Sequence, residues 1–278
     1  QKNTTILYHK MLQDLKYWYN PVVNITTQKD AAKQDLYYDN TVASAANYYT
    51  YDALYRLIQA KGREHAGGNV ATSYNDSARM GIAPLTADAS AMRRYIQYYE
   101  YDEVGNMLQM RHTTTGGTGN WTRNFDIDTT SNRLTGNSIG SDTTGTETYT
   151  YDARGNMIDG MNHLTSMAYN DENRLEVVVD ASGDITSYYQ YDMGGQRVRK
   201  TVINTASHTG KMRKYVGNWE VYNEYDNATT IVSLERETLH IMDDKARIAL
   251  IDTPITLPVV GEVQLLRYQY SNHLSTAT

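Results

Sequence analysis

The stretch YEYDEVGNMLQ (residues 99–109) recurs with changes as YTYDALYRLIQ (residues 49–59) and YTYDARGNMID (residues 149–159). The copies share one template, Tyr-Asp-x-x-Gly-Asn-x-apolar, from which the copy at residue 49 departs at the glycine and the asparagine. Internal repeats decide a fold when they are present, because each copy forms the same local unit and stacks on its neighbours. The chain is therefore predicted to be a repeat protein.

More distant copies fill the intervals between these three. They are YNPVVNIT (residues 19–26), IDTTSNRL (127–134), YNDENRL (169–175), YDMGGQRV (191–198) and, more weakly, YNDSARM (74–80). From residue 101 the copies begin at 101, 127, 151, 169 and 191, a spacing that accommodates two strands and two turns. Each repeat is therefore predicted to be one β-hairpin.

The template predicts the chemistry of a tight turn between two strands. Alternating tyrosines precede the turn, the aspartate can accept backbone N–H groups, and glycine or asparagine can adopt the positive φ that closes the turn. The predicted structural turn residues are Tyr51, Asp52, Tyr101, Asp102, Gly105, Asn106, Tyr151, Asp152, Gly155, Asn156, Tyr191, Asp192 and Gly194.

Two details of these turns remain open at the level of sequence. Val23 and Tyr55 stand where other copies have glycine, so their turns must adopt another geometry or bear strain. An arginine follows several turns (Arg133, Arg174 and Arg197), and we expect it to cover a tyrosine ring or to meet the aspartate of an adjacent repeat.

The segments outside the repeats are less regular. Residues 6–18 have helical spacing, although a strand fits nearly as well. Residues 80–95 and 113–122 are predicted loops, the first with a helical turn at residues 89–93. Past residue 198 the template fades, but residues 214–225, 231–242, 246–252 and 265–274 still have the pattern of strands.

Composition favours a thin sheet over a thick apolar core. The 278 residues contain 25 Tyr and 1 Phe, with a mean hydropathy of -0.63. Tyrosine suits a sheet that is wet on one side because its hydroxyl can face water.

The net charge is -6, and the sequence contains no basic run typical of nucleic-acid binding. We find no apolar stretch typical of a membrane helix and no secretory signal. The sequence does not begin with Met and is interpreted as a fragment.

Candidate chemical sites are weak. The chain has no Cys, its seven His stand singly, and no nucleotide-binding or nucleophile-elbow motif is present. His240 with Asp243 and Asp244 is the densest polar group and could bind a cation or act as acid and base, but an acidic turn after a strand is the favoured interpretation. No metal, cofactor or catalytic residue is predicted.

Several motifs together resemble the Rhs and YD-repeat proteins. They are YTYDALYRLIQAKGREH (49–65), AMRRYIQYYEYDEVGNML (91–108), NWTRNFDIDTTSNRL (120–134), YDMGGQRVRK (191–200), LERETLHIMDDKARIALIDT (234–253) and RYQYSNHLSTAT (267–278). The resemblance covers residues 17–278 and is greatest to the small (C) subunit, or a fused B-C protein, of bacterial Tc toxin complexes. The conjunction of LERETLHIMDDK with RYQYSNHL is its most specific part.

The resemblance implies a β-sheet strip that spirals into a hollow shell, is sealed by a B-type subunit or fused B region, and encloses a cytotoxic C-terminal segment. In that family an aspartyl autoprotease at the end of the shell releases the segment; its residues are expected beyond residue 278. Residues 1–198 are then a YD-repeat shell segment, and residues 199–278 are strands approaching the Rhs-associated core. The implied location is outside the bacterium after export, without nucleic acid or membrane contact by this segment.

Two other functions remain open. A YD shell could belong to an extracellular adhesion protein, with Trp18, Trp121 and Trp219 lining a carbohydrate groove. The chain could also form part of an autoproteolytic aspartyl core. A non-catalytic wall is the leading hypothesis, because every repeat carries its aspartate in a turn and one structural role then explains all of them.

Overall fold

The computed structural model describes residues 11–66, 90–117, 119–140, 142–226, 231–244, 246–255 and 264–272. These residues form strands and turns and contain no helix. The prediction of an all-β chain is therefore confirmed. Within these ranges no helix is present that could cross a membrane.

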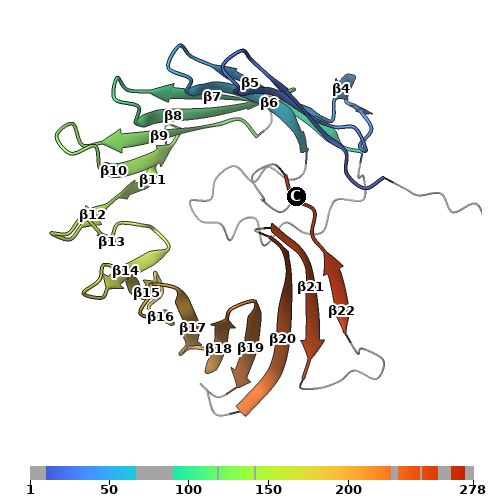
Figure 1. The fold of residues 1–278 in the computed structure, drawn as a ribbon. Helices are drawn as coiled ribbons and strands as arrows, with labels where there is room; N and C mark the ends of the chain where they lie inside the picture. The colour runs from blue at the N-terminus through green and yellow to red at the C-terminus, as the bar shows by residue number, and fades with distance from the viewer. Residues whose placement is uncertain are drawn as a thin grey trace, which may run out of the picture. The chain divides into compact units, whose positions relative to one another are not determined.

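The chain divides into two compact units, residues 1–146 and 147–278. The first carries a nine-stranded sheet in which spatial order follows chain order (Figure 1). Its strands are β1 (Leu15–Tyr19), β2 (Ile25–Asp30), β5 (Ala46–Tyr51), β6 (Leu57–His65), β7 (Met92–Tyr101), β8 (Met107–Thr114), β9 (Trp121–Ile127), β10 (Leu134–Ile139) and β11 (Asp142–Thr148). Between β2 and β5 the chain forms a separate hairpin of β3 (Leu36–Tyr38) and β4 (Thr41–Ala43).

The second unit repeats this plan. It begins with the hairpin of β12 (Thr150–Tyr151) and β13 (Met157–Asp159). A nine-stranded sheet follows, again in chain order: β14 (Leu164–Tyr169), β15 (Leu175–Asp180), β16 (Ile185–Tyr191), β17 (Arg197–Asn204), β18 (Thr209–Val216), β19 (Trp219–Asp226), β20 (Ile231–Asp243), β21 (Ala246–Pro254) and β22 (Leu265–Tyr268). The sheet thus continues past the repeats, as predicted.

The predicted hairpin repeats agree with the observed strands. The template turns join β1 to β2, β5 to β6, β7 to β8, β9 to β10, β12 to β13, β14 to β15 and β16 to β17, and the described pairings are antiparallel. One repeat is therefore one hairpin. The boundary at residue 198, which concerns where the sequence template fades, stays a prediction.

The segments outside the repeats bring two corrections. Residues 92 and 93, expected in a helical turn, belong to strand β7, because strand pairing with β6 extends to Met92. The loop expected at residues 113–122 is shorter, since β8 runs to Thr114 and β9 begins at Trp121. In the N-terminal segment the strand alternative applies from Leu15. The weak copy at residues 74–80 lies outside the described residues.

Burial is slight for a chain of this length. The buried apolar residues are mainly alanines (Ala43, Ala46, Ala60, Ala91 and Ala249, with Tyr149), and none of the described large side chains is fully buried. Close-packed interiors normally bury leucine, isoleucine and phenylalanine. The sheets are therefore held mainly by backbone pairing and by contacts along their faces.

Candidate functional site

The turns of the repeat share one geometry, shown by the turn between β7 and β8. Asp102 Oδ1 accepts the backbone N–H groups of Val104 and Asn106 at 3.0 and 2.7 Å. The N–H of Gly105 donates to the Asp102 carbonyl at 3.3 Å, and Gly105 has a φ of 99°. A tight turn followed by one left-handed residue is a common way to close a short hairpin.

Two of the turn aspartates, Asp102 and Asp152, are stabilised in the charged form. The side-chain amide of Asn106 donates to Asp102 Oδ2 at 2.7 Å, and Asn156 does the same for Asp152 at 2.9 Å. In each case this bond, together with the backbone N–H bonds, lowers the pKa of the carboxyl below its usual value. The turn geometry therefore favours an ionised aspartate.

Other copies reach the same geometry with different residues. Asp52 and Asn170 accept the N–H groups two and four residues further on, as Asp102 does. Asp192 accepts the N–H of Gln196 at 2.9 Å. Tyr51, Tyr101, Tyr151 and Tyr191 each end the strand before the turn. An asparagine oxygen is thus sufficient for the backbone part of the turn.

The positive-φ position explains two open details of the sequence. Val23 and Tyr55 adopt φ values of 68° and 64° and make the same closing bonds to Asn20 and Asp52. They keep the geometry and bear its strain. In the turn after Asp192 the left-handed residue is Gly195, with a φ of 84°, while Gly194 occupies the position before it. Template position therefore identifies Gly195, and not Gly194, as the closing residue.

Each of these turns is accompanied by a bulge. In the pair β7 and β8, Glu100 faces Gln109 but Tyr101 faces Met107, so Leu108 is an extra residue. The same shift occurs beside Tyr19, Tyr51, Tyr151, Tyr169 and Tyr191. A bulge bends its strand and increases the local twist. The repeat therefore adds one bend per hairpin.

The template tyrosine fastens one hairpin to the one before it. The hydroxyl of Tyr101 donates to the carbonyl of Leu57, the first residue of β6, at 2.8 Å. Tyr51 and Tyr191 make the equivalent bonds to Ile25 and Leu175, both at 2.8 Å. Burial raises the pKa of Tyr51 and Tyr101, so each hydroxyl remains a donor at neutral pH.

An arginine at the end of a turn reaches forward to the next turn. Arg56 Nη1 donates to the carbonyl of Asp102 at 2.8 Å, and its guanidinium lies 5.0 Å from the centre of the Tyr101 ring. Arg174 repeats this with the carbonyl of Asp192 at 3.0 Å and the Tyr191 ring at 5.9 Å. Arg174 thus combines both expected roles, although its acceptor in the next turn is the main-chain carbonyl and not the carboxylate. Arg197 lies over the rings of Tyr189 and Tyr215, at 5.8 and 5.0 Å.

Where the last turn residue is asparagine, its side-chain amide binds the next turn in place of the arginine. Asn106 Nδ2 donates to Asn132 Oδ1 at 3.2 Å, and Asn156 Nδ2 donates to Asn173 Oδ1 at 3.1 Å. Asn132 and Asn173 are the positive-φ residues of their turns. We call these contacts between successive turns, together with the tyrosine bonds, the turn ladder. The sequence indicated the turns but not these partners, which lie 16 to 46 residues away in the chain.

A buried polar cluster lies on one face of the first sheet. Glu64 accepts from Arg93 at 2.9 Å and lies 3.1 Å from His112, whose ring is stacked between Tyr95 and Trp121 at centroid distances of 5.3 Å. Although burial opposes it, hydrogen bonding and charge from His112 and Arg93 lower the pKa of Glu64. These partners hold the cluster in a closed arrangement.

The second sheet carries two further polar clusters. His240 lies 2.8 Å from Glu220 and 3.0 Å from Arg247, instead of the acidic pair that follows it in the sequence. Asp252, which is only 5% exposed, accepts the hydroxyl of Thr238 at 2.6 Å and forms an ion pair with Arg267. No group of three metal-ligating side chains occurs in the described ranges.

The three tryptophans do not form one described groove. Trp121 is stacked on His112, whereas Trp18 lies in the strand row of Thr27, Tyr48 and Lys61 on the opposite face of the first sheet. Trp219 belongs to the second unit. A carbohydrate groove lined by all three is therefore not observed.

The strip of tyrosine-linked hairpins fits the resemblance stated from the sequence, and the comparisons with known proteins agree. No family model matches the chain. It is homologous to the toxin subunits YenC1 and YenC2 of Yersinia entomophaga, with 28% identity to each over 83% and 74% of the chain. The chain spans only about a fifth of these relatives, 22% and 21% of their lengths.

Solved structures give the same result for the fold. The crystal structure of TcdB2-TccC3 matches with a TM-score of 0.76 and 24% identity over 96% of this chain and 13% of that chain. A structure of the Photorhabdus luminescens Tc holotoxin pore matches with a TM-score of 0.73 and 22% identity over 96% of this chain and 12% of that one. The chain is therefore similar in sequence to the YenC1 and YenC2 toxin subunits and has the β-fold of the matched part of the TcdB2-TccC3 structure.

Proposed function

We propose that this chain is a wall segment of a toxin shell that encloses a cytotoxic C-terminal segment of its own parent protein. The segment itself is non-catalytic in this proposal. Its partners are the rest of the shell, a B-type subunit or fused B region, and the enclosed cargo. The parent acts outside the bacterium after export.

The turn ladder carries the proposal. A wall must be thin, continuous and resistant to separation of its strands. Tyr51, Tyr101 and Tyr191 bond back to the previous hairpin, and in several turns an arginine or asparagine bonds forward to the next. Net hydrogen bonds contribute about 1 kcal/mol each, so a series of them stabilises a one-layer strip appreciably.

Two further features support a wall. The bulge beside each template tyrosine bends every hairpin, and a sheet that bends at regular intervals can wind instead of staying flat. Glu64 is also engaged by Arg93 and His112 on the same sheet, so this carboxylate is not free to bind a cargo.

Protease protection tests the proposal in the full-length parent protein assembled with its partner subunit. We expect the C-terminal segment to resist proteinase K while the shell is intact and to be cut after denaturation. Replacement of Arg56 and Arg174 by alanine should speed this cleavage, because both turn contacts are lost. Arg111→Ala is the matched control, since Arg111 stacks on Tyr98 at 4.2 Å on the opposite face of the sheet.

The results of these experiments distinguish a wall segment from an adhesion protein and from a protease core. A C-terminal segment that is cut equally fast with and without denaturation would refute enclosure. Attachment of the intact parent to cells through this segment, without a protected cargo, would assign an adhesion protein. Self-cleavage that depends on a described side chain, such as Asp252, would show that the segment belongs to a protease core.

A further inference from the structure

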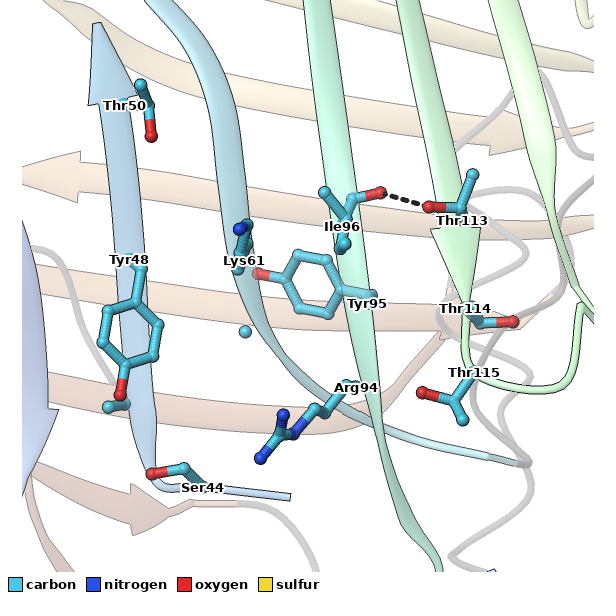
Figure 2. A pocket seen from close by; sticks show the side chains of 12 residues that line it. Ser44, Tyr48, Thr50, Lys61, Arg94, Tyr95, Ile96, Thr113, Thr114 and Thr115 are labelled. Atoms are coloured by element: carbon cyan, nitrogen blue, oxygen red, sulfur yellow. Dashed lines mark hydrogen bonds between the residues drawn. The ribbon is translucent and has the colours of Figure 1, made fainter. Parts of the chain in front are cut away.

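A hollow of about 660 Å³ lies on the face of the first sheet opposite His112 and Trp121 (Figure 2). Strands β5 to β8 form its floor, and Ser44, Tyr48, Lys61, Arg94 and Thr115 are among its lining residues. The row Tyr48, Lys61, Ile96 and Thr113 is fixed by strand pairing, so these side chains point to one side. The hollow is built on rigid, fully paired strands.

The hairpin of β3 and β4 forms a ledge beside this hollow. Arg94 Nε donates to the carbonyl of Val42 at 2.5 Å, and Arg63 Nη1 donates to the carbonyl of Gln34 at 2.7 Å. These bonds fasten the hairpin to the sheet and hold the Arg94 guanidinium at the edge of the hollow. Both arginines use carbonyl acceptors, so their positive charges are not neutralised by these contacts.

The charge of the hollow is positive on a chain whose net charge is -6. Among the described residues, no carboxylate lies within 4.0 Å of the Lys61 ammonium or the Arg94 guanidinium. Asp35, just before β3, stays charged, because the Ala45 N–H and the Ser44 hydroxyl, at 2.9 and 3.0 Å, lower its pKa. The cations that its charge attracts are Lys29 and Arg63, which do not line the hollow. An anion entering the hollow would therefore meet two cations.

The hollow is also lined by side-chain hydroxyls and by the aromatic ring of Tyr48. Tyr48 is 47% exposed and presents an aromatic face, and the hydroxyls of Tyr48, Thr50 and Thr115 have no hydrogen-bond partner among the described residues. Hydroxyls both donate and accept, which matches the hydroxyls of a sugar, and an aromatic face packs on the C–H face of a sugar ring. The volume falls within the range of ordinary small-ligand pockets, about 300 to 1,000 Å³.

We propose that this hollow is a binding site for a carboxylate-bearing saccharide of one or two rings. Lys61 and Arg94 bind the carboxylate, Tyr48 packs against the ring, and the threonine hydroxyls bind the sugar hydroxyls. An inorganic anion alone would leave most of the volume empty. A peptide strand would find no unpaired sheet edge here, because β5 to β8 are paired on both sides.

Calorimetric titration of the full-length parent protein with digalacturonate tests this site, with neutral galactobiose as the matched ligand. We expect digalacturonate to bind at least about tenfold more tightly, since a hydrogen bond to a charged group exceeds a neutral one by about that factor. Added salt should lower the affinity for digalacturonate more than the affinity for galactobiose. A sulfated disaccharide distinguishes carboxylate from sulfate as the preferred anion.

Variants locate the binding. Lys61→Gln should lower the affinity for digalacturonate about tenfold, with little effect on folding, because Lys61 makes no described polar contact. Tyr48→Ala should lower the affinity for both sugars. Lys33→Gln removes an exposed cation outside the hollow and should change nothing. Equal binding of both sugars, no binding, unaltered affinity in Lys61→Gln, or preference for a polyglutamate peptide would overturn the proposal.

Discussion

The repeat hairpins and the long strands β18 to β21 hold their neighbours in different ways. In the repeats, Tyr101 and Arg56 bind main-chain carbonyls of the adjacent hairpin. In β18 to β21 and the adjoining β22, contacts join one charged side chain to another, as in Arg213 with Glu220 and Asp252 with Arg267. The first kind of contact depends on one side chain and the second on two, so the two regions should respond differently to substitution.

The largest expected effect is in the second region. Asp252→Ala leaves the Thr238 hydroxyl and the Arg267 guanidinium without their acceptor and removes the 4.0 Å ion pair with Arg236, which we expect to cost about 3 kcal/mol. Native-state hydrogen exchange of β20 to β22 measures this as faster opening. Asp243→Ala, at an exposed strand end, is the control. Equal exchange in the two variants would contradict the role of the Asp252 cluster.

The second-largest expected effect concerns two glycines in the turns of the repeat hairpins. A Cβ on Gly195 would lie 3.2 Å from the Arg174 guanidinium, whereas a Cβ on Gly105 meets nothing within 4 Å. Gly195→Ala should therefore cost about 2 kcal/mol, from backbone strain and loss of the arginine contact, and Gly105→Ala about 1 kcal/mol, from strain alone. Hydrogen exchange at the two turns tests the difference. The reverse order would show that the arginine does not bridge the turns.

A single link of the turn ladder should have a smaller effect. Tyr101→Phe removes the hydroxyl that donates to the Leu57 carbonyl and should cost about 1 kcal/mol, with faster exchange confined to β6 and β7. Tyr98→Phe, on the other face of the same strand, is the matched control. If both variants exchange alike, the hydroxyl bond does not fasten the hairpins.

The smallest effect is a stabilisation. Val23 bears a φ of 68°, so Val23→Gly should relieve about 1 kcal/mol of strain, offset by the greater chain entropy of glycine, for a net gain of about 0.5 kcal/mol. Val22→Gly should destabilise, because Val22 has no positive φ to relieve. The two variants should shift the local exchange rates in opposite directions.

The sequence predicted the local parts of this architecture and missed the long-range ones. Turn chemistry is local, so Asp102, Gly105 and Asn106 could be assigned from spacing alone. The partners of Arg56 and Tyr101 could not, because a carbonyl acceptor leaves no signal in residue identity. The cluster of Glu64, Arg93 and His112 was missed for a related reason: strand register alone brings these side chains together.

The helical turn expected around Met92 is not formed, because strand pairing overrode local propensity. The segment around Met92 has alanines and arginines that suit a helix, but its backbone pairs with β6 from His65 onward. The strain at Val23 and Tyr55 was foreseen as one of two outcomes. It persists because the same aspartate or asparagine bonds hold the turn on both sides.

The choice of carbonyl acceptors also bears on how such chains evolve. Every amino acid supplies the carbonyl that Tyr51, Tyr101 and Tyr191 bind, so a neighbouring hairpin can change its side chains without a compensating change in the tyrosine. Hairpins can then diverge independently, or be duplicated and lost as modules. A chain that shares only 24% identity with the matched part of the TcdB2-TccC3 structure can in this way keep the same fold.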